Sequence, residues 1–461
     1  MREFELVIDE AFKNGLSPVS VVPFNTQVLY ECVGFRCGKA GLTGVELGDN
    51  RLPLAIDIFY NWPFPQVIMG ERYNFLVIRD TVFGLQDYIY LVSDDLLTVT
   101  LLHSSAYGSL LEAADFGEYA FLTNGVVMIY WDPTLAVWTE IVASATIPMM
   151  KTVCNFKGKA VGGNVSSAWY DCDETSYVWS KVGSMDFTPD MTNESGYRRC
   201  PYGGEVYHVR RLDDNVIGYS SKGITMLVPV GNPAATFGFK ELCDVGVVNK
   251  GAMNGNLKRH IFVGSDYVIR EVTNEGVKEL GYKYYMKQLD AEDIIVTYDK
   301  SKGDFYIGNS TKTFLLSPNG LTEINQHPSA VWRAYADSEN LGMVPDTVDS
   351  IQPVITTEAF DMGYKGQKTT ATVETDAMIC EGAEATIDWA NDLTSWGSGQ
   401  FTPINDMGIA TKAAAGNAFR FRLRFSKVYE VFRMGYMKVR YKMTDLRGIR
   451  GVYAPAPRGQ A

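Results

Sequence analysis

Side chains that could do acid–base chemistry are not spaced for it in this chain. Adjacent carboxylates occur in predicted turns at Asp94-Asp95, Asp213-Asp214 and Glu292-Asp293. Glycoside hydrolysis needs two carboxyl groups held apart across a pocket, which neighbours in one turn do not supply. The nucleophile-elbow, phosphate-loop, zinc-protease and dinucleotide-glycine patterns do not occur in the sequence. We therefore predict no catalytic residue and no enzymatic activity.

The cysteines and histidines do not form a metal-ligand pattern. None of the seven cysteines has CxxC spacing, Cys32 and Cys37 are the only close pair, and the four histidines are isolated. A structural zinc site needs four such ligands at characteristic spacings. We predict no metal and no cofactor, and we expect the thiols to be free and buried in a reducing compartment.

Aromatic side chains gather between positions 169 and 187, at Trp169-Tyr170, Tyr177, Trp179 and Phe187. Such a cluster can stack on a sugar or a base. Packing between two sheets is the commoner role for aromatic side chains, and it is our interpretation here.

The sharpest local pattern is an alternation of apolar and basic residues late in the chain. In Phe419–Phe425 the alternation places Arg420, Arg422 and Arg424 on one face of a strand. A second strand, Met434–Lys442, repeats it with a basic face made by Lys438, Arg440 and Lys442. Side by side, these strands would form a cationic sheet surface.

This basic surface has two interpretations. It can be a solvated outer face whose charges discourage edge-to-edge aggregation. It can also be an assembly interface, and a protein partner is favoured over nucleic acid because arginine pairs with carboxylates in bidentate fashion. The net charge of −12 also disfavours wrapping of a phosphate backbone.

Strand–turn–strand units that recur at an even step must position these residues. They begin at Ile217-Gly-Tyr-Ser, Ile261-Phe-Val-Gly and Phe305-Tyr-Ile-Gly, so that each lies 44 residues after the one before. A step of about 40–45 residues is the length of one four-stranded propeller blade. With the less regular units earlier in the chain, we predict an all-β fold with a β-propeller of about six blades.

Residues that interrupt the strand pattern help to divide the chain into three parts. Pro, Asp, Thr and Ser interrupt the pattern from Pro345 to Ile355, and strands with a different spacing follow. We predict an N-terminal entry segment joining the propeller (residues 1–70), the propeller (71–345) and a C-terminal antiparallel β-sandwich with a tail (346–461). Ala106–Ala114 and Pro328–Glu339 are the short helix candidates, and Asn124-Gly125 predicts a type I′ hairpin turn.

The sequence shows neither a secretory signal nor a membrane span. Acidic residues occupy the N-terminus where a signal peptide needs an apolar run, and no apolar stretch reaches about 18 residues. We expect synthesis in a cytoplasm and no stable membrane insertion.

Several segments in order along the chain resemble one family, the tail hub or nozzle proteins of short-tailed bacteriophages. They are Trp62-Pro-Phe-Pro-Gln66, Val161–Cys172, Tyr177–Pro189, Asn193–Arg199, Gly366-Gln-Lys-Thr369, Phe419–Phe425 and Arg447-Gly-Ile-Arg-Gly451.

The resemblance implies a structural virion protein of the phage tail, made in the cytoplasm of a host bacterium. It implies a homohexameric ring below the portal and the head-to-tail adaptor protein. Such a ring continues the DNA-exit channel, helps to retain packaged DNA and anchors tail fibres or spikes. Because DNA must slide through the ring, we expect an acidic or neutral lumen, with the arginine face at a protein interface. An insertion at residues 186–202 is our choice for a docking or gating loop, with Asp186, Phe187, Tyr197, Arg198, Arg199 and Tyr202 as its contact residues.

Two other functions fit the same sequence. The first is a propeller-type glycan-binding or glycan-degrading tail protein, which a carboxylate pair with an arginine in a central cavity would favour. The second is a cellular propeller that binds peptides, which predicts a monomer with seven regular blades. The oligomeric state distinguishes this second alternative from a ring.

Overall fold

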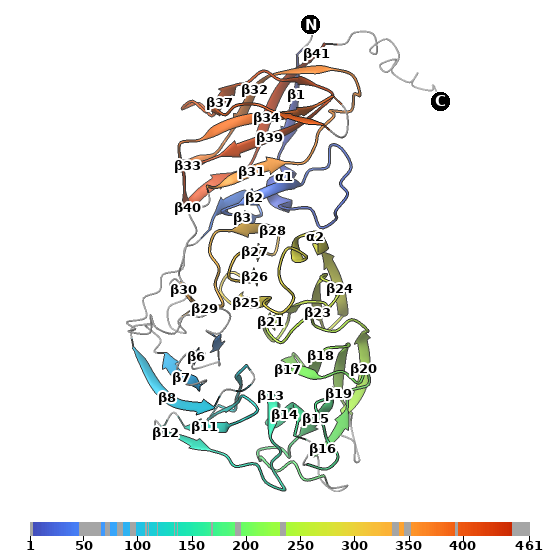
Figure 1. Ribbon diagram of the computed structural model, residues 1–461, viewed down its shortest axis with the longest axis vertical. Coiled ribbons are helices and arrows are strands. Elements are labelled where there is room, and N and C mark those ends of the chain that lie inside the picture. The colour runs from blue at the N-terminus through green and yellow to red at the C-terminus, as the bar shows by residue number, and fades with distance from the viewer. Residues whose placement is uncertain are drawn as a thin grey trace, which may run out of the picture. The chain divides into compact units, whose positions relative to one another are not determined.

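The computed structural model is built almost entirely from β-strands (Figure 1). It describes residues 3–45, 66–69, 74–80, 86–92, 98–106, 108, 110–117, 119–132, 134–135, 137–166, 169–189, 195–230, 237–333, 341–344, 352–391 and 395–444. The chain forms two compact units. The sandwich unit comprises Met1–Leu47, Phe314–Asn325 and Asp349–Ala461, and the propeller unit comprises Gly48–Thr313 and Gln326–Val348. The predicted all-β class, a propeller with an antiparallel sandwich, is confirmed.

The propeller unit contains a series of four-stranded antiparallel sheets, each a simple meander. The first two sheets are β5 (Gln66–Met69), β6 (Asn74–Asp80), β7 (Gln86–Val92) and β8 (Val99–Ala106), then β9 (Glu112–Asp115), β10 (Ala120–Thr123), β11 (Met128–Asp132) and β12 (Val137–Glu140). The third and fourth are β13 (Met150–Phe156), β14 (Lys159–Val165), β15 (Ser176–Trp179) and β16 (Gly196–Arg199), then β17 (Val206–Leu212), β18 (Asn215–Ser220), β19 (Ile224–Pro229) and β20 (Phe237–Cys243). The fifth is β21 (Met253–Gly255), β22 (His260–Val263), β23 (Ile269–Thr273) and β24 (Gly276–Gly281).

Shorter elements complete the propeller unit. A helix, α2 (Lys283–Met286), precedes the paired strands β25 (Ile295–Asp299) and β26 (Asp304–Gly308), and the hairpin β29 (Ala330–Arg333) and β30 (Leu341–Val344) follows. The first strands of the sheets are neighbours: β13 contacts β9 and β17, β21 contacts β25, and β29 contacts both β25 and β5. The last of these contacts brings the end of the series back to its beginning.

The predicted repeat corresponds to the second strand of consecutive sheets. Ile217 lies in β18, Ile261 in β22 and Phe305 in β26, and all three are fully buried. The 44-residue step is therefore the step from one sheet to the next.

Three local predictions are wrong, two of them helices and one a turn type. Both helix candidates contain strands, β9 and β29, because pairing with β10 and β30 overrides the local helical pattern. The hairpin after β10 is present, but Gly125 occupies its first central position with φ +79°, as in a type II′ turn. The side chain of Asn124 instead accepts hydrogen bonds from the backbone N–H groups of Val126 and Val127.

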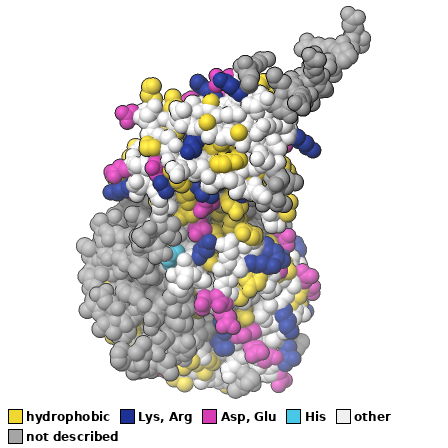
Figure 2. Space-filling model, turned by 45° about the horizontal axis from the view of Figure 1, so that its top comes forward, with side chains coloured by type: hydrophobic (Ala, Val, Ile, Leu, Met, Phe, Trp, Pro, Cys, Tyr) yellow, Lys and Arg dark blue, Asp and Glu magenta, His cyan; other side chains and the backbone are white. Residues whose placement is uncertain are grey.

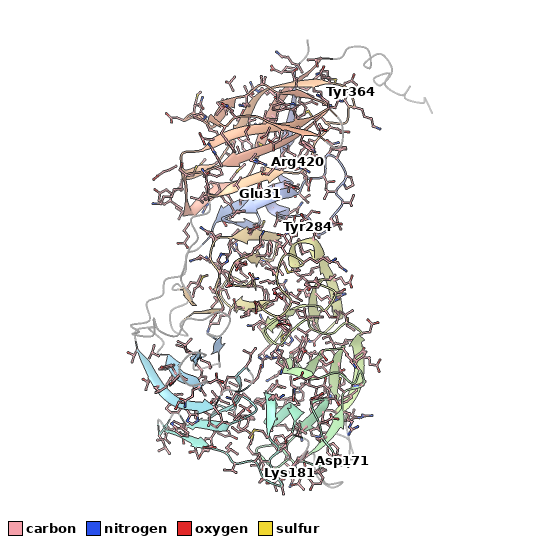
Figure 3. All side chains as sticks on the ribbon, viewed as in Figure 1. Glu31, Asp171, Lys181, Tyr284, Tyr364 and Arg420 are labelled. Atoms are coloured by element: carbon pink, nitrogen blue, oxygen red, sulfur yellow. The ribbon has the colours of Figure 1, made fainter. Side chains whose placement is uncertain are left out.

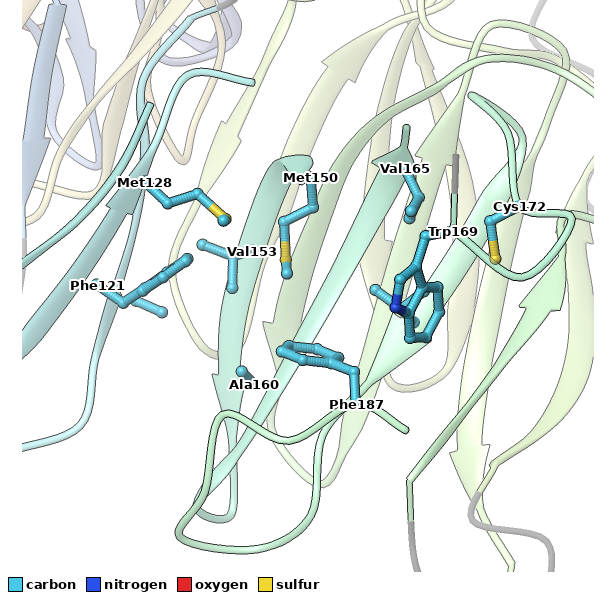
Figure 4. Packing of buried hydrophobic residues seen from close by; sticks show 11 residues of the cluster. Phe121, Met128, Met150, Val153, Ala160, Val165, Trp169, Cys172 and Phe187 are labelled. Carbon is cyan, nitrogen blue, oxygen red and sulfur yellow. The ribbon is translucent and has the colours of Figure 1, made fainter. Parts of the chain in front are cut away.

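Apolar side chains fill the space between neighbouring sheets. Phe121 and Met128 of the second sheet belong to one buried cluster with Met150 and Val153 of the third (Figure 4). The third and fourth sheets meet where Tyr177 packs on Gly218, and a Cβ at Gly218 would collide with the phenol ring. The glycine of the first predicted repeat is thus explained by this close approach.

A repeated hydrogen bond also links consecutive sheets. A side chain of one sheet donates to the backbone carbonyl 42 residues later: Asn164 Nδ2 to Val206 O (3.1 Å), His208 Nε2 to Lys250 O, and Asn254 Nδ2 to Val296 O (3.1 Å). Asn164 adopts φ +55°, a backbone conformation that asparagine tolerates better than most residues. Val206 and Val296 are buried, so these bonds give their carbonyl groups a donor that water cannot supply.

The sandwich unit is assembled from both ends of the sequence. Its N-terminal elements are β1 (Glu3–Ile8), α1 (Glu10–Asn14), β2 (Leu29–Val33), β3 (Phe35–Gly38) and β4 (Gly41–Gly44), and β27 (Thr313–Leu316) and β28 (Leu321–Ile324) come from the middle of the chain. The C-terminal strands are β31 (Val354–Thr357), β32 (Lys368–Thr375), β33 (Met378–Glu381), β34 (Glu384–Ala390), β35 (Trp396–Ser398), β36 (Thr402–Pro403), β37 (Ile409–Thr411), β38 (Ala415–Gly416), β39 (Ala418–Arg424), β40 (Lys427–Met434) and β41 (Met437–Met443).

Strand pairing explains why the unit boundaries differ from the predicted ones. We expected residues 1–70 to join the propeller, but β1 pairs with β41, β2 with β31 and β4 with β40. Met1–Leu47 therefore belongs to the sandwich unit, because its backbone hydrogen-bonding groups are satisfied there. Phe314–Asn325, which we placed in the propeller, is also part of the sandwich unit through the parallel pair Val33 and Glu323.

The cysteines are free, and five of the seven are buried, with Cys243 and Cys380 half-buried. No helix in the described part of the chain is both long and apolar enough to cross a membrane.

We predict that Asn164→Ala lowers the free energy of unfolding by about 1–3 kcal/mol, because it removes the donor to the Val206 carbonyl and to Glu205 and places alanine at a φ of +55°. Urea unfolding followed by circular dichroism measures the change. Asn256→Ala is the matched control, since Asn256 makes a more exposed bond 42 residues along the chain, to the Tyr298 hydroxyl. An equal loss in both variants would contradict a special role for the buried bond.

Candidate functional site

The predicted basic strand lies in the interior of a sheet, with β31 on one side and β34 on the other. Phe419, Phe421, Leu423 and Phe425 are fully buried, as the alternation predicts. On the opposite face, Arg420 lies across from Asp388 and Arg424 across from Glu384. The arginines therefore stand in a row next to a row of acids.

Each arginine of β39 has a carboxylate partner within the sandwich unit. Arg424 Nε contacts Glu384, Arg422 Nη2 lies 3.3 Å from Asp388 Oδ2, and Arg420 Nη2 lies 3.5 Å from Glu358 Oε2. We call this set of three pairs the arginine ladder. Burial raises the pKa of Glu358, although the charge of Arg420 opposes the shift.

Aromatic rings cover the arginine ladder. The Arg420 guanidinium carbon lies 4.1 Å from the centroid of Tyr30 and 4.5 Å from that of Trp396, and Arg424 lies 3.8 Å from the centroid of Phe401. Figure 3 labels Arg420 of the ladder. Stacking between rings fixes the guanidinium plane. The buried Nε of Arg420 has no hydrogen-bond partner in the described part of the chain.

The second basic strand, β41, has the predicted alternation but not the predicted neighbour. Its buried face is made by Met437, Val439, Tyr441 and Met443, while Lys438, Arg440 and Lys442 share the opposite face. The strand pairs with β1 and β32, so the expectation that β39 and β41 lie side by side is wrong. Hydrogen-bonded pairing across the sheet, which the spacing of charges does not encode, decided the arrangement.

Acidic residues also flank the basic face of β41. Glu3 lies opposite Lys442 and Glu5 opposite Arg440, both on β1. On β32, Glu374 lies 3.8 Å from Lys438 and 3.9 Å from Arg440. On the face in Figure 2, Lys and Arg side chains are likewise interspersed with Asp and Glu. Lys438, Arg440 and Lys442 therefore form a narrow basic stripe between carboxylates, which we call the β41 stripe, in place of the expected cationic surface.

The predicted docking or gating loop is mostly ordered structure. Phe187 is buried in the same apolar cluster as Met150, and a hydrogen bond from Lys181 lowers the pKa of Asp186 to about 2. Gly196–Arg199 forms the outer strand β16, where Tyr197, Arg198 and Arg199 are exposed, and Tyr202 packs on Gly223. The interpretation of 196–202 as an insertion is wrong, because these residues complete the third sheet. Residues 190–194 lie outside the described residues.

The aromatic cluster is mostly packing, as interpreted. Tyr177, Trp179, Phe187 and Trp169 are buried, whereas Tyr170 is 47% exposed. Within the described ranges, no group of three or more His, Cys, Asp or Glu residues is arranged to hold a metal ion.

A buried charged cluster in the propeller unit was missed. Glu112 of β9 is 2% exposed and contacts His208 Nδ1 (2.7 Å) and Arg210, both on β17. Burial alone raises the pKa of Glu112, but the charges of Arg210 and His208 outweigh it and leave the pKa lowered. The cluster joins the second and fourth sheets. These residues are far apart in the sequence, and no local signal connects them.

Lys368, which lies in the segment Gly366–Thr369, is a second buried charged group that the sequence analysis missed. The residue is fully buried, and its Nζ donates to the carbonyl groups of Tyr364 and Gly366. Burial lowers the pKa of this amine to about 8, and Asp361 weakly opposes the shift. Because the amine is enclosed by its own loop, its role is to hold that loop.

Comparison with known proteins gives no family for this chain. The scan of protein families finds no match, and no curated protein sequence matches. Among solved structures, one similar chain is described as "Crystal Structure of Mitotic Checkpoint Complex", with a TM-score of 0.39, 10% identity, and coverage of 60% of this chain and 82% of that one. Another is Hsv2p of Kluyveromyces lactis, with a TM-score of 0.30, 11% identity, and coverage of 57% and 98%.

We predict that Arg422 and Asp388 are coupled by about 1–2 kcal/mol, because Asp388 is 7% exposed and loses its charge partner in Arg422→Met. A double-mutant cycle with Asp388→Asn, read by urea unfolding, measures the coupling. The exposed pair Lys13 and Glu10 serves as control, with an expected coupling of about 0.3 kcal/mol. If the two coupling energies are equal, burial does not strengthen the Arg422–Asp388 pair.

We predict that Lys368 makes the protein more stable as pH rises from 7.5 to 9.5. The folded state releases the Lys368 proton near pH 8, whereas the unfolded state keeps it until about pH 10.5. Between these values the unfolded state binds more protons, so unfolding becomes less favourable by about 2 kcal/mol. The measurement is the unfolding free energy of the wild type minus that of Lys368→Met at each pH, which cancels other groups. If this difference in unfolding free energy does not change with pH, the pKa of the Lys368 amine is not lowered in the folded state.

Proposed function

We propose that this chain is a structural subunit of the tail of a short-tailed bacteriophage, where it forms a hub or nozzle ring. The ring would continue the DNA-exit channel below the portal and adaptor, help to retain packaged DNA, and anchor fibres or spikes. The role is non-enzymatic. Its site of action is the virion, and its partners are other copies of the chain, the adaptor, the fibres or spikes, and the DNA that passes through.

The observation that carries the proposal is the division of the chain into two different β-units. A closed ring needs a heterologous interface, in which two different surfaces of each subunit meet. A propeller unit and a sandwich unit offer two different surfaces to such an interface. The segments that resemble the tail-hub family occur in both units: Val161–Cys172 overlaps β14, and Phe419–Phe425 overlaps β39. Trp62–Pro65 and Arg447–Gly451 lie outside the described residues.

The charge distribution supports the same role. A conduit for DNA should not hold phosphates, since each cation contact must be broken as the DNA slides. The chain carries a net charge of −12, and the described basic strands are paired with acids. Tight, salt-sensitive binding of duplex DNA by the purified chain would argue against the proposal.

The arginine ladder and the β41 stripe differ as assembly surfaces. Arg420, Arg422 and Arg424 are committed to acids and rings of their own unit. Arg440 is more exposed, with half of its side chain accessible, and it shares Glu374 with Lys438. The interface part of the proposal therefore rests on Lys438, Arg440 and Lys442.

We predict that Lys438→Glu/Arg440→Glu prevents ring formation on the adaptor, because placing like charges together in an interface costs several kcal/mol. Mass photometry and electron microscopy of the chain mixed with its head-to-tail adaptor should show hexamers for the wild type and few for the variant. Lys278→Glu, an exposed charge reversal on β24, should leave the rings intact. A wild-type chain that stays monomeric with the adaptor contradicts the ring, whereas intact rings in the double variant contradict only the interface.

A further inference from the structure

Two tyrosines expose their rings next to one another on the third sheet of the propeller unit. Tyr170 lies between β14 and β15 and is 47% exposed, and Tyr197 lies on β16 and is 38% exposed. Their ring centroids are 6.2 Å apart and their planes differ by 31°. No hydrogen bond to another described residue engages either hydroxyl group. We call these residues the tyrosine pair.

A buried tryptophan supports the tyrosine pair. The Trp169 ring is roughly perpendicular to both tyrosine rings, at 78° to Tyr170 and 72° to Tyr197. Its Nε1 donates to Ala145 O (3.0 Å), and the side chain belongs to the apolar cluster between the second and third sheets. The tyrosine pair therefore stands on a fixed base.

The backbone under Tyr170 is in an unfavourable conformation. Tyr170 and Asp171 have φ values of +43° and +54°, in the left-handed region that bulky residues rarely adopt. Such a conformation costs free energy. Because nearly half of the Tyr170 side chain is exposed, its burial offsets little of that cost. A residue suited to this backbone, such as Asn or Gly, would fold more easily. The tyrosine at this position thus calls for a reason other than folding.

Charged groups with fixed positions border the tyrosine pair. Arg199 Nη2 donates to Asp171 O (3.0 Å) and lies 3.7 Å from Asp173 Oδ2. The other carboxylate oxygen of Asp173 accepts hydrogen bonds from Thr175 and Ser176. A positively charged donor, Arg199, and a negatively charged acceptor, Asp173, are therefore held in place beside the exposed tyrosine rings.

We propose that the tyrosine pair is a binding site for a neutral sugar, namely a hexopyranose unit of a polysaccharide. The apolar face of the sugar ring would stack on Tyr170 or Tyr197, and its hydroxyl groups would bond to Asp171, Asp173 and Arg199. The site is independent of the proposed ring function.

The charges favour a sugar over a nucleic acid. A base would also stack on tyrosine, but binding of a nucleic acid strand needs a positively charged groove for its phosphates. Asp173 lies 3.7 Å from Arg199 and offsets its charge, Asp171 adds a further negative charge beside Tyr170, and Arg198 stacks instead on Phe239. A neutral ligand rich in hydroxyl groups matches this balance.

The test is titration of the intact chain with maltoheptaose, cellohexaose and chitohexaose, followed by tryptophan fluorescence and calorimetry. At least one oligosaccharide should bind, and Tyr197→Ala and Tyr170→Asn should each weaken it roughly tenfold, through loss of stacking and buried area. Tyr284→Ala is the matched control, since Tyr284 is a 61% exposed tyrosine on α2. It should leave binding unchanged.

A stability measurement separates binding from a purely structural role. Tyr170→Asn suits the left-handed backbone and should keep or raise the midpoint of thermal unfolding while it weakens sugar binding. A lower midpoint would assign Tyr170 to packing and overturn the proposal. Failure of all three sugars to bind, binding unaffected by the tyrosine variants, or preferential binding of an oligothymidylate would each overturn it as well.

Discussion

A four-stranded sheet with two apolar faces cannot fold alone, because each face must be covered by a neighbouring sheet. This constraint governs the propeller unit. Phe121 and Met128 of one sheet complete their packing only with Met150 and Val153 of the next. Polar groups follow the same rule, since the carbonyl of Val206 receives its donor from Asn164 in the preceding sheet. Stability and closure are therefore properties of the series of sheets, and no single sheet holds them.

In the sandwich unit, the equivalent constraint is the pairing of distant strands. β1 hydrogen-bonds to β41, so the first residues of the chain are needed to complete a sheet made by its last strands. Formation of such pairs requires closure of long loops, which opposes folding through chain entropy. The buried faces of β39 and β41 offset that cost by removing aromatic and aliphatic side chains from water.

Several charged side chains of the described residues are paired inside their own unit. In the arginine ladder, each guanidinium pairs with a carboxylate on β34 or directly after β31, and aromatic rings cover two of the three guanidinium groups. Glu112 is likewise held by His208 and Arg210. Charges that are satisfied in this way fix strand register and add little to long-range attraction of partners. Recognition would then depend on shape, on the more exposed β41 stripe and on exposed aromatic rings such as the tyrosine pair.

The sequence alone determined the features that depend on local periodicity. The 44-residue step located the second strands of three consecutive sheets, and alternation identified the buried faces of β39 and β41, because side chains on a strand alternate between faces. Tertiary structure decided which strands are neighbours. It separated β39 from β41, moved Met1–Leu47 into the sandwich unit, placed β9 and β29 within the two helix candidates, of which residues 334–339 lie outside the described residues, and brought Glu112 to His208. Pairing partners are chosen by burial and hydrogen bonding across long loops, and no spacing within one segment records that choice.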